Sequence, residues 1–218
     1  MEVMAVKVAR VIVHVPTDEL NPQGRAVLPE LTAALVARYS FVKYPVKFED
    51  YDEQKGVSYE LGKWNDVAIH RLAIYGTGLL CDTSSSTNDS EAILRDALIW
   101  ASETFGLVYR PDMFNRKVYL SELIVKEDRP LSALNPKLNG MTAKLSTRIS
   151  EIIGQPTTFE VVSLGMNQDQ FFSKNTLAGF RIERLTDIPF SENRYYTAAS
   201  LPTDEHIELL TEFAEALV

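Results

Sequence analysis

The feature that most constrains the fold is the way short β-rich segments follow one another in groups. Successive strands with short connections pair antiparallel, whereas parallel pairs need a long crossover between them. Gly76-Thr77-Gly78 predicts a hairpin between two of these segments, because glycine reaches the positive φ values that tight turns use. An antiparallel sheet is therefore expected from the succession Tyr44–Phe48, Val57–Leu61, Val67–Tyr75 and Leu79–Asp82.

Four other stretches have the apolar spacing of a helix, with hydrophobic residues three or four positions apart. They are Leu28–Tyr39, the stripe from Ile93 to Ala101 closed by Gly106, Leu138–Ile152 stopped by Gly154, and Thr203 to about Leu217. Further strands are predicted at Val11–Val15, Val118–Val125, Thr158–Leu164, Leu177–Leu185 and Tyr195–Ser200. Because strands outnumber helices and come in groups, we expect an α+β fold, a largely antiparallel sheet or sheets with helices on one face.

The order helix, strands, helix occurs twice along the chain, which divides it into two similar halves. We expect an N-terminal α+β half at residues 1–126, a linker or helix entry at 127–136 and a C-terminal α+β half at 137–218. When the second helices of the halves are aligned, Glu91 and Ile93 fall on Glu205 and Ile207, but little else agrees. A true repeat and a chance likeness both remain open, and the halves can also pack as a single domain.

Composition excludes several classes of partner. The chain of 218 residues has 22 Lys and Arg against 30 Asp and Glu, a formal charge of −8. Binding to duplex nucleic acid or to an anionic membrane depends on clustered cations, which this sequence lacks. No uncharged run reaches the roughly 20 residues of a membrane span, and one cysteine allows no internal disulfide. We therefore expect a cytoplasmic protein.

The most unusual local composition is a hydroxyl-rich stretch between the predicted hairpin and the second helix. Ser84, Ser85, Ser86, Thr87 and Asn88 lie where free amide groups at a helix start can bind an anion such as phosphate. Against a ligand, the neighbouring acids would repel phosphate, and no glycine-rich phosphate loop is present. Capping of the helix by Thr87, Asn88, Asp89 or Ser90 explains the same composition and is the favoured interpretation.

The acids of this stretch suggest a second use. Asp82, Asp89 and Glu91, together with the hydroxyls, are oxygen ligands of the kind that Mg²⁺ prefers. The alternative function is thus a metal-assisted phosphoester or nucleotide hydrolase that uses this loop. Apart from the Mg²⁺ of this alternative, no cofactor is expected, because the sequence has no dinucleotide fingerprint and no metal-ligand spacing.

The last predicted helix carries five acids and no Lys or Arg: Asp204, Glu205, Glu208, Glu212 and Glu215. A solvated, solubilising face is the simpler interpretation. The alternative is an acidic surface for a basic protein partner, since complementary charge accelerates encounter and fixes register. We therefore expect a non-enzymatic interaction module, such as an inhibitor, an immunity-like protein or a chaperone-like binder. Self-association is compatible with this hypothesis.

Overall fold

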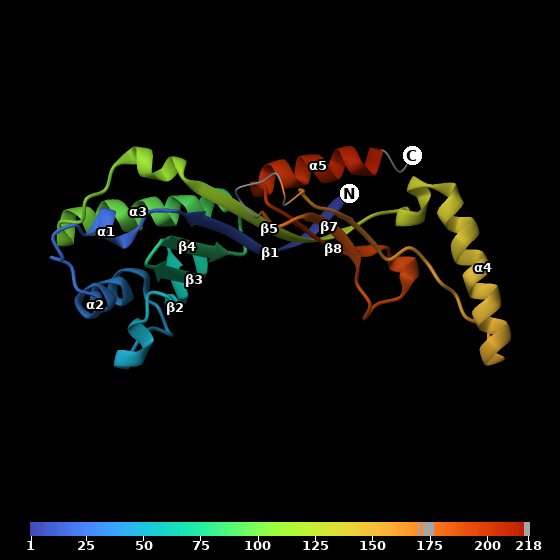
Figure 1. Ribbon diagram of the computed structural model, residues 1–218, viewed down its shortest axis with the longest axis horizontal. Coiled ribbons are helices and arrows are strands. Elements are labelled where there is room, and N and C mark those ends of the chain that lie inside the picture. Colours follow the sequence, from blue (N-terminus) through green and yellow to red (C-terminus); the bar gives the residue numbers. More distant parts are fainter. Residues whose placement is uncertain (170, 172–176, 216–218) are drawn as a thin grey trace. The chain divides into compact units, whose positions relative to one another are not determined.

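A computed structural model describes residues 1–169, 171 and 177–215 of the chain (Figure 1). Within this part the strands are β1 (Glu2–Val13), β2 (Val57–Trp64), β3 (Val67–Tyr75), β4 (Gly78–Thr83), β5 (Lys117–Lys126), β6 (Ser163–Met166), β7 (Phe180–Arg184) and β8 (Arg194–Ala199). The helices are α1 (Thr17–Leu20), α2 (Leu28–Tyr39), α3 (Thr87–Phe105), α4 (Pro136–Ile153) and α5 (Thr203–Glu215). The last two residues predicted for the final helix lie outside the described residues. None of the helices in the described part combines the length and apolar character needed to span a bilayer.

The strands form an antiparallel sheet in the order β2-β3-β4-β1-β5-β8-β7-β6, which confirms the predicted α+β fold. Along the chain, β1, α2, three strands and α3 are followed by β5, α4, three strands and α5. The same order of elements therefore occurs twice. In this correspondence β1 to β4 match β5 to β8 in turn. From one edge the sheet runs β2, β3, β4, β1, and from the other edge it runs through their counterparts β6, β7, β8, β5.

The chain divides into two compact units. The first consists of Met1–Ala5, Glu122–Ala199 and Glu205–Val218, and the second of Val6–Ser121 and Ser200–Asp204. The long strands β1 and β5 each contribute residues to both units.

The core of the second unit lies between one face of its strands and helices α2 and α3. Alternate residues of the strands, such as Val11, Leu72 and Cys81, are buried against Leu35 of α2 and Leu94 of α3. Each such side chain contributes about 1.5–3 kcal/mol when it is fully removed from water. Helix α3 ends at Gly106, whose φ of 68° terminates the helix in the left-handed conformation.

The predicted hairpin between β3 and β4 is present, but the reason given for its glycines is wrong. Tyr75 pairs with Gly78, so Gly76 and Thr77 form the turn, and neither glycine has a positive φ. At Gly78 a Cβ would lie 2.2 Å from the carbonyl oxygen of Val13. Close approach of β1 therefore requires a glycine there.

Two predicted strands differ from the structure. Residues Tyr44–Phe48 form no strand; Lys43 makes a single bridge with Glu60, and a 3₁₀ turn follows at Phe48–Tyr51. Asp50 accepts hydrogen bonds from the amides of Val46 and Lys47, which occupies backbone donors that a ladder would need. The segment predicted at Thr158–Leu164 is mostly irregular, and its strand, β6, starts only at Ser163.

The first unit contains a buried arginine on β7. The side chain of Arg184 is 1% exposed and donates to the carboxylate of Glu160 and the amide oxygen of Asn193, both at 3.1 Å, and to the hydroxyl of Tyr195 at 3.0 Å. Its guanidinium lies 4.8 Å from the ring centre of Phe190 and 5.1 Å from that of Tyr195. This network joins β7, β8 and the turn between them.

Candidate functional site

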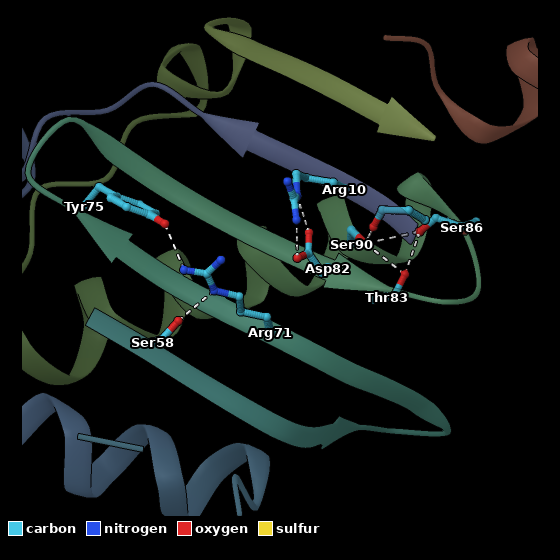
Figure 2. Close-up of polar contacts among 9 residues, drawn as sticks. Arg10, Ser58, Arg71, Tyr75, Asp82, Thr83, Ser86 and Ser90 are labelled. Carbon is cyan, nitrogen blue, oxygen red and sulfur yellow. Dashed lines mark hydrogen bonds and ion pairs between the residues drawn. The ribbon is translucent and has the colours of Figure 1, made fainter. Parts of the chain in front are cut away.

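Asp82, near the end of β4, is held by a neighbouring strand rather than left open for a ligand (Figure 2). Its carboxylate accepts two hydrogen bonds from Arg10 of β1, at 2.6 and 2.8 Å. The strand register also places Asp82 opposite Arg71 of β3, whose guanidinium instead donates to Ser58 and Tyr75. The Asp82 side chain is only 10% exposed.

The hydroxyl groups after Asp82 close the start of α3 (Figure 2). Ser86 is the N-cap: its Oγ accepts from the amide of Asp89 at 3.1 Å and donates to the Asp89 carboxylate at 2.9 Å. Ser90 is fully buried; it donates to the carbonyl oxygen of Ala9 at 2.7 Å and is hydrogen bonded to Thr83 at 2.9 Å. The predicted N-cap lay one to four residues after Ser86, but the prediction that the loop caps the helix agrees with these hydrogen bonds.

Within the second unit, the first residues of α3 and α5 hydrogen bond to each other. The Thr87 amide donates to the hydroxyl of Thr203 at 3.0 Å, and the Thr203 amide donates to the hydroxyl of Thr87 at 2.9 Å. Asn88 donates to the Asp204 carboxylate at 2.9 Å. Each helix thus caps the other, and amides that an anion would need are already used.

Of the five residues predicted to bind a ligand, one, Ser84, is exposed beside a further reactive group. Ser84 Oγ lies 2.9 Å from Nε2 of His70 on β3, and both residues are exposed. Sequence reasoning missed this pair because 14 positions separate the two residues. A serine nucleophile needs a base that is itself oriented by a third group. In the described part of the chain, no carboxylate contacts the His70 ring.

The acids proposed for Mg²⁺ do not converge. Asp82 pairs with Arg10 and Asp89 with Ser86, while Glu91 accepts from Lys117 at 2.6 Å, Arg95 at 2.7 Å and Tyr119 at 3.0 Å. Among residues 1–169, 171 and 177–215, no three His, Cys, Asp or Glu side chains are grouped so that they could hold a metal ion. The geometry therefore lends the hydrolase alternative no support.

Glu91 is instead the centre of a cationic cluster. Burial tends to raise the pKa of this carboxyl, but the hydrogen bonds from Lys117, Arg95 and Tyr119 outweigh burial and lower the pKa below its ordinary value. Arg95 also lies over the ring of Phe114, at 4.1 Å from its centre. The role of Glu91 is to join α3 to β5.

The acids of α5 lie on the outside of the helix. All five predicted partner-binding residues are exposed, whereas His206 and Leu210 are buried on the other side. At 100° per residue, the acids span about 100° of the helix circumference. They are Asp204, Glu205, Glu208, Glu212 and Glu215, which we call the acidic face of α5. Apart from the Asn88 contact of Asp204, no described side chain makes an ion pair or hydrogen bond with them.

A cavity of about 100 Å³ in the second unit was not predicted. Its lining is mostly apolar and comes from α1, α2, α3 and the strands, including Leu31, Leu79 and Leu98, with Thr17 and Glu53 as polar members. Glu53 accepts a hydrogen bond from Thr17 at 3.0 Å. The volume is well below the range of about 300–1,000 Å³ that ligand pockets usually have.

Comparison with known proteins adds no relative: no protein-family model matches the chain, and no similar curated protein was found.

Proposed function

We propose that the protein is a non-enzymatic interaction module whose acidic face of α5 binds a basic protein partner. The observation that carries this proposal is the exposure of five acids on one side of a helix that contains no Lys or Arg. A partner with a complementary row of cations would gain both attraction and a defined register. An inhibitor, an immunity-like protein or a chaperone-like binder would each use such a surface.

The position of the acids along the helix strengthens the argument. Glu212 and Glu215 lie in the last turns of α5, where the negative end of the helix dipole repels them. Each such charge costs about 0.3–1 kcal/mol in an exposed helix. Cations of a bound partner would remove this cost, so binding is coupled to the stability of α5.

The remaining parts of the proposal follow from charge. With 30 acids against 22 bases, the protein is a poor ligand for duplex nucleic acid or an anionic membrane. We place it in the cytoplasm, acting without a cofactor or metal.

The test is capture of a partner by the purified chain from a native lysate. In the test variant the five acids of the acidic face are changed to their amides: Asp204→Asn, Glu205→Gln, Glu208→Gln, Glu212→Gln and Glu215→Gln. A control variant with the same change in net charge neutralises five exposed acids elsewhere: Glu2, Glu30, Glu49, Asp66 and Glu103.

We expect the wild-type chain and the control to recover a basic protein in stoichiometric amount, in a salt-sensitive manner, and the α5 variant to lose it. If the α5 variant and the wild type recover the same proteins equally, the acidic face is not the binding surface. If only the control loses the partner, the surface lies elsewhere on the molecule.

A further inference from the structure

Helix α4, drawn in yellow in Figure 1, has an apolar side that its own unit does not cover. None of its described side chains is buried, and Met141, Leu145 and Ile152 are 69%, 44% and 78% exposed. Its counterpart α2, which follows β1 as α4 follows β5, buries Leu31 and Leu35 in a core. Three large apolar side chains in a row on one exposed helix side are unusual for a monomer.

The apolar residues of α4 have a symmetric spacing. Leu138, Met141, Leu145, Ile149 and Ile152 are separated by three, four, four and three positions. At 100° per residue they lie within about 80° of one another and form a single seam along the helix. The spacing reads the same in both directions, with Leu145 at its centre.

A seam of this kind is complementary to itself. When a second α4 is laid antiparallel across a two-fold axis at Leu145, that residue meets the partner's Leu145. Leu138 then meets the partner's Ile152, and Met141 meets the partner's Ile149. Two-fold interfaces require that one patch fits itself, and every apolar side chain of this seam finds an apolar counterpart.

The charges beside the seam favour the pairing at its ends and oppose it near its centre. One flank carries Lys137, Lys144, Arg148 and Glu151. In the antiparallel pair, Lys137 at one end lies beside the partner's Glu151, and the symmetric contact forms at the other end. Antiparallel helices also bring opposite ends of their dipoles together. Arg148 lies beside the partner's Lys144 with the same axial offset, so two like-charge pairs weaken the association near its centre.

The other flank of α4 is occupied by its own chain. The Thr157 amide donates to Ser150 Oγ at 2.8 Å, and the Phe159 amide donates to Ser146 Oγ at 2.9 Å. The returning segment therefore runs beside the helix on the flank opposite the charged one.

We propose that α4 is a self-association surface, through which two copies of this chain pair antiparallel about Leu145. The occupant is a second copy because the seam is palindromic and its end charges, Lys137 and Glu151, are complementary in the antiparallel pair. This proposal is independent of the acidic face of α5. With 18 residues, α4 offers a footprint about 27 Å long and 10 Å wide, which is small for an interface. The dimer is therefore weak.

Sedimentation equilibrium of the full chain tests the association. We expect the wild type to be monomeric at low micromolar concentration and substantially dimeric by about 500 µM. Leu145→Glu should weaken dimerisation at least tenfold, because it places two charges at the centre of the apolar seam. Thr147→Glu, on the opposite side of the same helix, adds the same charge and should leave the association within about twofold. A wild type that stays monomeric, or equal effects of the two variants, would overturn the proposal.

Cross-linking of single-cysteine positions tests the register with a short bismaleimide reagent. The native Cys81 does not interfere, because it is fully buried and burial raises the pKa of its thiol. Leu145→Cys should link to itself. Met141→Cys alone should not, because the two cysteines would be about 12 Å apart along the helix axis. A mixture of Met141→Cys and Ile149→Cys should give the mixed dimer.

Two other occupants give different results. If the helices paired in parallel, Met141→Cys would link to itself. If α4 instead docked on the acidic face of α5 of a second copy, neutralising that face would abolish dimerisation, and Leu145→Cys would not link to itself. Either result would refute the antiparallel pairing at Leu145.

Discussion

Replacing Asp82 by alanine should destabilise the second unit strongly, because it leaves the guanidinium of Arg10 without its carboxylate. The Asp82 side chain is 10% exposed and that of Arg10 is 28% exposed, and two hydrogen bonds join them. Breaking a fully buried pair costs about 3–5 kcal/mol, whereas an exposed pair contributes about 0–1 kcal/mol. The intermediate exposure of Arg10 lets water reach its guanidinium, so we expect a loss of about 2–3 kcal/mol, between these two limits.

Matched variants separate charge from packing. Asp82→Asn keeps the size and one acceptor oxygen, and we expect a loss of about 1–2 kcal/mol. The double variant Arg10→Met with Asp82→Leu replaces the pair by apolar groups of similar volume and should lie within about 1 kcal/mol of the wild type. The double variant should therefore be more stable than Asp82→Ala, although it changes one more residue.

Urea unfolding followed by tryptophan fluorescence measures these differences. The chain has two tryptophans, Trp64 and Trp100, and both belong to the second unit, so the signal reports the unit that contains the pair. With a slope of about 2 kcal/mol per M, Asp82→Ala should lower the midpoint by about 1–1.5 M. A decrease of less than about 0.3 M would show that the pair behaves as a surface ion pair. A double variant as unstable as Asp82→Ala would show that packing, rather than loss of the ion pair, sets the decrease in stability.

Three further outcomes are expected. Arg184→Met removes the donor at the centre of the first unit and should cost about 3 kcal/mol, seen as early loss of amide-exchange protection in β7 and β8 while tryptophan fluorescence is little changed. Thr87→Val and Thr203→Val should each cost about 1 kcal/mol, and the double variant should cost less than their sum, since each hydroxyl serves the amide of the other residue. The pKa of Glu91 is lowered in the folded chain, so its contribution is present above its ordinary pKa of 4.5 and is lost as the pH falls below that value; in acid titrations Glu91→Gln should be less stable than the wild type at pH 7 and lose less stability on acidification.

Local patterns predicted most of the elements. Helix α3 follows from its apolar spacing and from Gly106 at its end, and β3 was predicted with its observed bounds. The segment at Tyr44–Phe48 failed because β propensity competes with local hydrogen bonding, and the Asp50 carboxylate takes the backbone amides. β propensity describes how well a side chain fits a pleated sheet surface, and it takes no account of a turn that competes for the same backbone amides.

The candidate site shows more clearly that local patterns do not predict contacts between residues far apart in the sequence. The acidic face of α5 follows from sequence, because helical spacing alone places its residues on one side. The pairing of Asp82 with Arg10 does not, because the two residues are 72 positions apart and meet only through the register of β1 on β4. In the serine-rich loop several residues are suitable caps, and only the extended backbone of Ser86, with φ of −153°, selects one.

The two halves of the chain are most alike where the third strand of each group leads into a helix. Strands β4 and β8 are both six residues long, three residues separate each from the next helix, and Thr87 and Thr203 then begin α3 and α5. These threonines are 116 positions apart, and the same offset places Ser90 on His206 and Leu94 on Leu210, all of them buried. The alignment of Glu91 with Glu205 was therefore displaced by two residues, which is why so little else agreed.

The halves differ most in the first helix of each. Helix α2 places its apolar side on the strands of its own unit, whereas α4 leaves a longer and symmetric seam exposed. Exposed Met and Ile side chains on a helix of which no described side chain is buried contribute almost nothing to folding, because their apolar surface stays in water. The exposed side chains of α4 therefore add little to the stability of the first unit, to which contacts such as those of Arg184 contribute. The apolar residues of α4 do not stabilise their own unit, but their spacing is the same in both directions along the helix. Association with a second copy explains this pattern better than packing within one chain.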